Sequence, residues 1–305
     1  MRIALAGLAT SHPYTDALTL ARHAELVVWE PDPERLRRFT GEHPAVKVAG
    51  SLEEALAGSP DGVVLTVPNP RVPQALARVL ETGAACFVNK PAAASRAQLL
   101  ELDRLPIHDR VLSSSVLRFA PAFRRAGVDR GDVLAVRATV RHDVGMWADG
   151  YNAWQDTPGE GGGTMVTMGI HGVELLVALL GGDVRLAGAA GARRHYTTLR
   201  SEDSGVMALR WDDGITGTVE ILGVSESESY TVTVHRRGST DSIVIEGGDD
   251  PVKGLGYEGT IEAFLAMVGG APSPVPWKET RAVLDVLVSA RESVTPERVS
   301  ARGSG

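Results

Sequence analysis

Apolar runs of strand length alternate with amphipathic, helix-length segments over the first 120 residues of the chain. The expected strands are residues 2–7, 24–30, 47–51, 61–69, 85–91 and 110–117. The expected helices are residues 13–23, 32–43, 52–58, 72–82 and 95–105, the second beginning with Asp32 as N-cap and Pro33 in its first turn. Strands alternating with helices are typical of a parallel sheet covered on both faces. We therefore expect a doubly wound α/β domain over residues 1–119.

From residue 120 onward the strands become longer, and their residues alternate between apolar and polar. These strands are expected at residues 133–143, 184–198, 204–214, 215–224, 228–238 and 239–248. Several are separated by Asp-Gly, Gly-Ser or Ser-rich turns, which favour an antiparallel sheet. Helices are expected near residues 169–180, 259–268 and 278–294. The pattern predicts an α+β domain over residues 120–305 with a large, mostly antiparallel sheet and a frayed tail at 301–305.

Composition excludes several classes of protein. The 305 residues include 31 Lys and Arg against 38 Asp and Glu, a net charge of −7, which disfavours nucleic-acid binding. No uninterrupted apolar run of about 18 residues is evident, and the N-terminus makes a poor signal peptide, so we expect no membrane segment. The single cysteine, Cys86, cannot form an internal disulfide, which favours the cytoplasm. Only four of the basic residues are lysines: Lys47, Lys90, Lys253 and Lys278.

A degenerate glycine-rich loop follows the first expected strand. The dinucleotide-binding pattern G-x-G-x-x-G falls on Gly7, Ala9 and His12, so only its first glycine is present. Thr10 and Ser11 could offset this loss by capping the following helix or donating to a phosphate. The loop predicts a pyrophosphate site, and the alternative is a simple strand-to-helix turn.

Two further places along the sheet edge fit a nucleotide. Glu30 ends the second expected strand about 20 residues after the loop, where a carboxylate can hold the ribose diol of NAD and would repel the 2′-phosphate of NADP. Its alternative is an exposed acid that begins a turn. Pro68 and Asn69 end the strand at 61–69, at the carboxyl edge where doubly wound sheets bind ligands. NAD is therefore the expected cofactor rather than NADP.

Four short motifs occur in a fixed order: VPN at 67–69, NKP at 89–91, LRFAP at 117–121 and GGGTMVTMGIHGVE at 161–174. In their order and spacing, and in its closing helices, the chain resembles the Gfo/Idh/MocA family of oxidoreductases. The resemblance implies an N-terminal Rossmann domain followed by a mostly antiparallel sheet. It also implies hydride transfer between NAD(P) and a carbinol or carbonyl carbon of a sugar, cyclitol or related small polar molecule.

The resemblance assigns roles to individual residues. Lys90 and His171 become the catalytic pair, because a base must take the hydroxyl proton as hydride leaves and a cation stabilises the developing alkoxide. The alternatives are a surface lysine and a core histidine. The expected cofactor-binding residues are Gly7, Ala9, Thr10, Ser11, His12, Glu30, Pro68, Asn69, Asn89 and Lys90. The expected substrate-binding residues are Arg118, His142, Trp154, Thr167 and Glu174.

The chain also departs from the family's pattern. Thr167 stands where the family often has an aspartate four residues before the histidine, and Asn89 replaces the glutamate before Lys90. Glu174, three residues after His171, could partner the imidazole instead. These changes, with Ala9 and His12 in the loop, leave open a non-oxidoreductase descendant. Such a protein would be a lyase or hydrolase with internally recycled NAD, or a binding or regulatory protein without cofactor.

Other polar and aromatic residues have two interpretations. His142 ends a sheet strand and either contacts substrate or is solvated; Trp147, Tyr151 and Trp154 either stack on a sugar ring or pack at the domain boundary. No metal site is expected, because the histidines lack metal-ligand spacing. The expected partners are a small-molecule substrate and further copies of the chain, in a homodimer or homotetramer formed through the C-terminal sheet.

Overall fold

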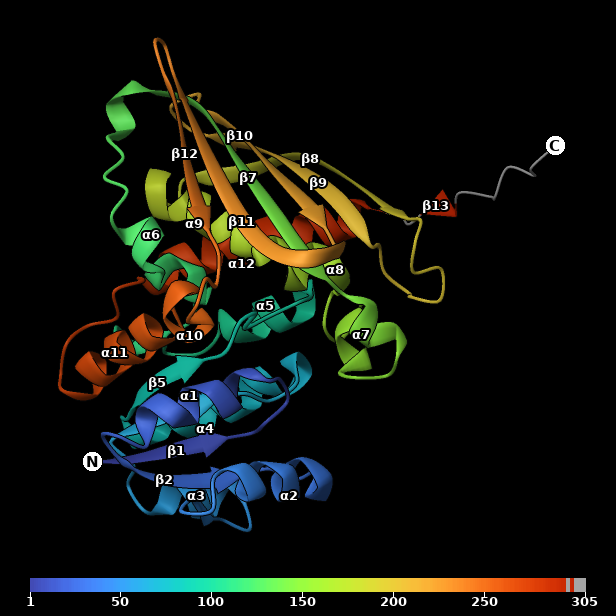
Figure 1. The fold of residues 1–305 in the computed structure, drawn as a ribbon. Coiled ribbons are helices and arrows are strands. Elements are labelled where there is room, and N and C mark those ends of the chain that lie inside the picture. Colours follow the sequence, from blue (N-terminus) through green and yellow to red (C-terminus); the bar gives the residue numbers. More distant parts are fainter. Residues whose placement is uncertain (295–296, 299–305) are drawn as a thin grey trace.

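The computed structural model describes residues 1–294 and 297–298, so the tail at 301–305 lies outside the described residues. Two β-sheets, each with helices packed against it, form the molecule, one above the other in Figure 1. The expected sites lie where the ends of the first sheet face the helices beneath the second. The fold class expected from the sequence, a doubly wound parallel sheet followed by a mostly antiparallel one, is confirmed.

The first sheet is parallel throughout, with strand order β3-β2-β1-β4-β5-β6. Its strands are β1 (Arg2–Ala6), β2 (Glu25–Trp29), β3 (Lys47–Val48), β4 (Gly62–Leu65), β5 (Ala85–Val88) and β6 (Val111–Leu112). The connecting helices are α1 (His12–Leu20), α2 (Pro33–Glu42), α3 (Leu52–Ala57), α4 (Val72–Thr82) and α5 (Arg96–Leu102). Asp32 caps α2 as predicted, accepting from the backbone N–H groups of Glu34 and Arg35. The order reverses between β1 and β4, and this is where doubly wound sheets bind ligands.

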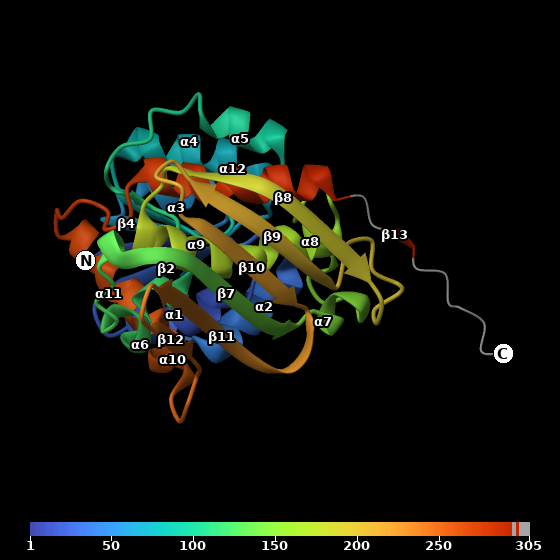
Figure 2. The ribbon, with the colours of Figure 1, turned by 90° about the horizontal axis from the view of Figure 1, so that it is seen from above.

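The second sheet has seven strands in the order β12-β11-β7-β10-β9-β8-β13. They are β7 (Val133–Asp143), β8 (Val184–Arg193), β9 (Ser204–Trp211), β10 (Thr216–Leu222), β11 (Val224–Arg236), β12 (Thr240–Ile245) and β13 (Glu297–Arg298). The pairs β7 with β10 and β8 with β13 are parallel, and the other pairs are antiparallel. Seen from above, the strands lie in front of the helices α8, α9 and α12 (Figure 2).

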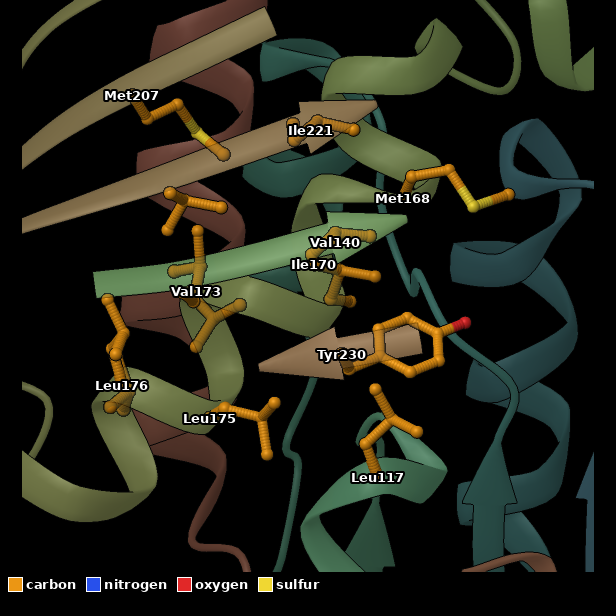
Figure 3. Close-up of a cluster of buried hydrophobic side chains, with 14 of the residues drawn as sticks. Leu117, Val140, Met168, Ile170, Val173, Leu175, Leu176, Met207, Ile221 and Tyr230 are labelled. Atoms are coloured by element: carbon orange, nitrogen blue, oxygen red, sulfur yellow. The ribbon is translucent and has the colours of Figure 1, made fainter. Parts of the chain in front are cut away.

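Helices α8 (Gly163–Thr167), α9 (Gly169–Leu180) and α12 (Trp277–Ser293) cover the inner face of this sheet. Figure 3 shows Val173 and Ile170 of α9 packed among side chains of the sheet, with Tyr230 and Leu117 at the edge of the cluster. Residues Gly163–Leu180 have a mean hydropathy of 1.6, long and apolar enough to cross a membrane, and 89% of this stretch is buried in the protein. The stretch is not an uninterrupted apolar run, because it includes Thr164, Thr167, His171 and Glu174. The burial explains the apolar character, since this segment forms the core of the second domain.

Helix α11 (Tyr257–Val268) follows the second sheet in sequence but packs against α1 and β5 of the first domain. Phe264 and Met267 are fully buried in the same cluster as Ile3 and Leu5 of β1. The last part of the chain therefore completes the core of the first domain and brings α11 to the boundary between the two sheets.

Several local elements differ from those expected. The sixth strand ends at Leu112 rather than at residue 117, and residues Val116–Phe119 form a 3-10 helix capped by Ser115. The short helices α6 (Pro121–Arg124), α7 (Gly145–Ala148) and α10 (Pro251–Gly254) were not expected. Further 3-10 turns lie at Asn69–Arg71, Arg130–Asp132 and Ala153–Asp156. The early end of β6 matters most, because the segment after it carries Ser115, whose hydroxyl contacts His171 in the site described below.

Candidate active site

The loop between β1 and α1 is tightly fixed to the neighbouring strand. Gly7 has φ +92°, and a Cβ there would lie 2.4 Å from the carbonyl oxygen of Thr66, so only glycine fits. The backbone N–H of Ala9 donates to that same carbonyl at 2.9 Å. Ala9 is itself buried. The first glycine of the pattern is therefore required by the backbone conformation.

A cavity of about 490 Å³ lies at the carboxyl edge of the first sheet, and we call it the nucleotide cavity. Its wall includes Gly7, Glu30, Arg35, Pro68, Arg71 and Trp154. Trp154 comes from the second domain, and its indole N–H is buried with no hydrogen-bond partner among the described residues. The cavity thus combines a glycine turn, a carboxylate and an unused donor.

Glu30 acts on the backbone of this cavity. Its side chain is buried, and Oε2 accepts from the Leu8 N–H at 2.5 Å while Oε1 accepts from the Asp32 N–H at 2.9 Å. The carboxylate therefore joins the loop to the start of α2. Each oxygen keeps a second lone pair, which could still accept from a ribose hydroxyl.

Three of the expected cofactor residues, Ala9, Asn69 and Asn89, are buried and do not line the nucleotide cavity. The amide of Asn69 donates to the carbonyl oxygen of Pro91. The amide nitrogen of Asn89 lies 3.3 Å from the Thr10 hydroxyl, which fixes the loop against the end of β5. Asn69, Asn89 and Ala9 therefore hold the segments around the cavities in place.

A second, smaller cavity of about 100 Å³ lies between the two domains, and we call it the catalytic pocket. It is lined by both members of the expected catalytic pair and by Thr10, Ser11 and His12 of the loop. Lys90, which follows β5, is 9% exposed; its Nζ donates to the Thr167 carbonyl at 3.3 Å and lies 3.0 Å from Nε2 of His171. The structure therefore brings Lys90 and His171 into direct contact.

The second ring nitrogen of His171 is also occupied. Its Nδ1 lies 2.7 Å from the Ser115 hydroxyl oxygen. A lysine ammonium only donates, so Nε2 of His171 accepts from Lys90, and the ring proton is on Nδ1, where it donates to Ser115. Ser115 Oγ also accepts from the Leu117 N–H at 3.2 Å, which fixes its position.

Burial sets the protonation of this pair. It lowers the pKa of Lys90 to about 8, an effect that Glu228 and Glu174 partly oppose. Burial, followed by the nearby Lys90 charge, lowers the pKa of His171 well below its usual value. At neutral pH the proton is therefore on Lys90, and the imidazole is neutral.

Glu174 does not partner the imidazole, contrary to the sequence-based interpretation. It accepts from the Ser115 N–H at 2.9 Å and from the Ser114 hydroxyl, and the Arg118 guanidinium lies 3.9 Å away. Burial raises the pKa of Glu174 to about 7. Glu174 and Arg118 are absent from the pocket wall, so they support the serine segment that holds His171.

The other expected substrate residues are divided between the two cavities. Thr167 lines the catalytic pocket, but its hydroxyl donates to the Gly161 carbonyl at 3.2 Å. His142 also lines it, with Nδ1 2.8 Å from the Asp143 carbonyl oxygen. Trp154 lines the nucleotide cavity instead.

Sequence reasoning missed several residues of the pocket. Glu228 and Tyr230 of β11 line it, with the Tyr230 hydroxyl donating to Glu228 at 2.6 Å, and Tyr257 reaches it from the start of α11. The alternating pattern around Glu228 and Tyr230 predicted a strand, but nothing in the sequence indicated that these residues line a pocket. Ser115 is the last of three serines within residues 110–117, all of which were expected to form a strand.

Comparison with known proteins supports this architecture. Residues 128–244 match the family described as the GFO/IDH/MocA C-terminal domain, and a search of curated proteins gave no match. One similar solved structure is GenD2 from gentamicin A biosynthesis in complex with NAD, with TM-score 0.82 and 21% identity over 96% of this chain and 93% of that chain. Another is a myo-inositol dehydrogenase from Corynebacterium glutamicum, with TM-score 0.80 and 17% identity over 96% of each chain. Residues 128–244 are thus similar to the GFO/IDH/MocA C-terminal domain, and the whole chain shares its two-domain fold with these two solved structures.

Proposed function

We propose that this chain is an NAD-dependent oxidoreductase that moves hydride between nicotinamide and a carbinol or carbonyl carbon of a sugar, cyclitol or related small polar molecule. The contact between Lys90 and His171, buried in a pocket beside the nucleotide cavity, carries the proposal. Dehydrogenases among the similar structures support the reaction class. The substrate itself is proposed only as a class.

The nucleotide cavity fits a dinucleotide in its donor and acceptor groups. Gly7 keeps the loop close to β4, the buried Trp154 N–H is free to donate, and Glu30 offers acceptor lone pairs. Glu30 would disfavour a 2′-phosphate, which supports NAD over NADP. Arg35 and Arg71 line the same cavity and could favour a phosphate, so NADPH must be tested alongside. When bound, NAD would supply the hydride acceptor.

The chain's own residues would handle the proton. In the oxidation direction, Lys90 would donate a hydrogen bond to the reacting oxygen and stabilise the developing negative charge. As the hydroxyl proton reaches Lys90 Nζ, one ammonium proton would pass to Nε2 of His171, so Lys90 stays charged and the ring becomes imidazolium. Ser115 would hold the ring through Nδ1 during this transfer. In the reduction direction the same proton returns to the substrate oxygen.

The test begins with titrations of NADH and NADPH followed by nicotinamide fluorescence, and continues with NAD⁺ turnover on myo-inositol, scyllo-inositol and glucose. We expect saturable NADH binding that is tighter than NADPH binding. Lys90→Met should leave NADH binding unchanged and lower turnover by about 10³-fold, because it removes both the proton carrier and the charge at the reacting oxygen. Lys278→Met is the matched control, since that side chain is 89% exposed.

Three outcomes would count against the proposal. Full turnover by Lys90→Met would remove the mechanism. Failure of both nucleotides to bind would favour a protein without cofactor. Tightly co-purified NAD without net turnover would favour a lyase or hydrolase that recycles its cofactor internally.

A further inference from the structure

His12 stands where the loop pattern has its third glycine, but its side chain does not lie at the nucleotide cavity. The ring lines the catalytic pocket, together with Lys90 and His171. It packs against the Tyr257 ring of α11, with centroids 5.2 Å apart and planes inclined at 53°. The substitution of glycine has therefore placed an imidazole in the reaction space.

This imidazole has unused hydrogen-bonding capacity. Its Nδ1 is buried and has no hydrogen-bond partner among the described residues. His171, in the same pocket, has both ring nitrogens engaged. A buried polar atom without a partner is costly in a folded protein, and a bound ligand is one way to supply the missing partner.

The charge state of His12 restricts what that partner can be. Burial, then the charges of Lys90 and His142, lower its pKa to about 3, so the ring is neutral in ordinary buffers. A neutral imidazole offers one donor and one acceptor, as a hydroxyl does. The ring is therefore suited to a neutral hydroxyl group and gives no charge attraction to a phosphate or carboxylate.

The size of the pocket relates His12 to the reacting centre. Its volume is about 100 Å³, and Lys90, His171 and His12 line this one space together. Lys90 would bind the oxygen of the reacting carbon, with His171 directly behind it. Because His12 lines the same pocket, its ring would face a substituent close to that oxygen.

We propose that His12 is a specificity residue that hydrogen-bonds the hydroxyl next to the reacting carbinol, so that the enzyme selects substrates with vicinal hydroxyl groups. This inference rests on the proposed oxidoreductase function. Under this inference the enzyme would discriminate polyols from simple alcohols and from 2-deoxy compounds, which lack the neighbouring hydroxyl. A hydroxyl that fills the unused capacity of Nδ1 gains a hydrogen bond, and an analogue that lacks it leaves a buried group unpaired.

His12→Gly provides the test, because it removes the imidazole and restores the third glycine of the nucleotide loop. We expect NADH affinity to stay the same or increase, and kcat/KM for myo-inositol to fall about tenfold through KM. A monodeoxy-inositol that lacks the hydroxyl next to the reacting carbon should be a poor substrate for the wild type, and His12→Gly should process it no worse than the wild type does. His12→Asn, which keeps a donor and an acceptor, should recover part of the preference for myo-inositol.

Other results would overturn the inference. An unchanged KM in His12→Gly, or an equal loss on myo-inositol and its deoxy analogue, would show that the ring does not read this hydroxyl. A loss of NADH affinity in place of an effect on KM would assign the ring to the cofactor. Binding of myo-inositol to the nucleotide-free protein, measured by saturation-transfer NMR, keeps the two proposals separate. Weaker binding by His12→Gly would support the role of His12 even if no nucleotide binds, and equal or absent binding in wild type and variant would reject it.

Discussion

The two cavities at the carboxyl edge of the first sheet are built from different groups. The nucleotide cavity, about 490 Å³, is shaped mainly by backbone: a left-handed glycine, a loop held against β4 and a carboxylate that binds two backbone N–H groups. The catalytic pocket, about 100 Å³, is shaped by side chains that bond one another, from Lys90 through His171 to Ser115. The two cavities therefore depend on different features of the sequence.

This difference explains how a loop can lose two of its three glycines and keep its shape. Ala9 is accommodated because its N–H still bonds the Thr66 carbonyl, and His12 directs its ring into the neighbouring pocket. The catalytic pocket has less tolerance of this kind, because each of its hydrogen bonds depends on one particular side chain. We expect backbone changes to affect the nucleotide cavity most and side-chain changes to affect the pocket most.

Of the variants that compare backbone with side-chain support of the two cavities, Gly7→Ala is expected to have the largest effect. The new Cβ would lie 2.4 Å from the Thr66 carbonyl oxygen at φ +92°, so the loop must move away from β4. We expect NADH affinity to fall by ~100-fold, with a lowered melting temperature. Fluorescence titration and thermal unfolding would measure the two effects.

Gly83→Ala is the matched control for backbone strain alone. Gly83 also has positive φ, +70°, but its Cβ would enter open space at the end of α4. It should lower the melting temperature slightly and leave NADH affinity unchanged. If both variants reduced NADH affinity equally, the shape of the loop would not be what determines binding.

Ser115→Ala should give the next largest effect, now in the catalytic pocket. It removes the partner of His171 Nδ1 and leaves a buried nitrogen unpaired, which costs about 1–3 kcal/mol. We expect kcat to fall roughly 30-fold with little change in NADH affinity, and the pH profile of kcat to shift because the imidazole is held less firmly. Ser115→Thr keeps the hydroxyl and should restore most of the rate. A rate loss that Thr does not restore would point to structural damage instead.

The fold could largely be predicted from the sequence, because most of its elements follow local patterns. The α4 helix at Val72–Thr82 and the α9 helix at Gly169–Leu180 have the ends that periodicity indicated. The alternating strands of the second sheet were also evident. Strand order, by contrast, depends on contacts between distant segments, as does the return of α11 to the first domain.

The candidate site was predictable only where one residue type carries the chemistry. Lys90 is notable in a chain with four lysines, and His171 follows a glycine run. Ser115 could not be found this way, because the three serines at 113–115 were expected to continue the strand at 110–117, whereas in the structure that strand ends at Leu112. For Glu174 the local pattern was misleading. Helical spacing predicted a contact with His171, but in the structure its carboxylate accepts hydrogen bonds from Ser114 and Ser115 instead.

Asp16 is a buried polar group that lines neither cavity, so a change there should affect stability and leave both cavities intact. It lies on α1, one turn after His12, is 1% exposed, and neither carboxylate oxygen has a hydrogen-bond partner among the described residues. Burial raises its pKa to about 8. Between about pH 4 and 8 the carboxyl is therefore protonated in the folded chain and ionised in the unfolded chain, so its effect on folding becomes less favourable as pH rises.

Asp16→Asn should therefore stabilise the fold more at high pH than at low pH. An amide cannot ionise, so the unfolding free energy of the variant relative to the wild type should rise by roughly 1 kcal/mol for each pH unit between pH 5 and 8, while the cost of burying the amide is the same at both pH values. Urea unfolding at the two pH values would measure it, with Asp249→Asn as the control because Asp249 is exposed. NADH affinity and turnover should not change. A variant that gains no stability relative to the wild type between the two pH values, or that loses turnover, would mean that Asp16 has a partner in the working protein and that burial alone does not explain its raised pKa.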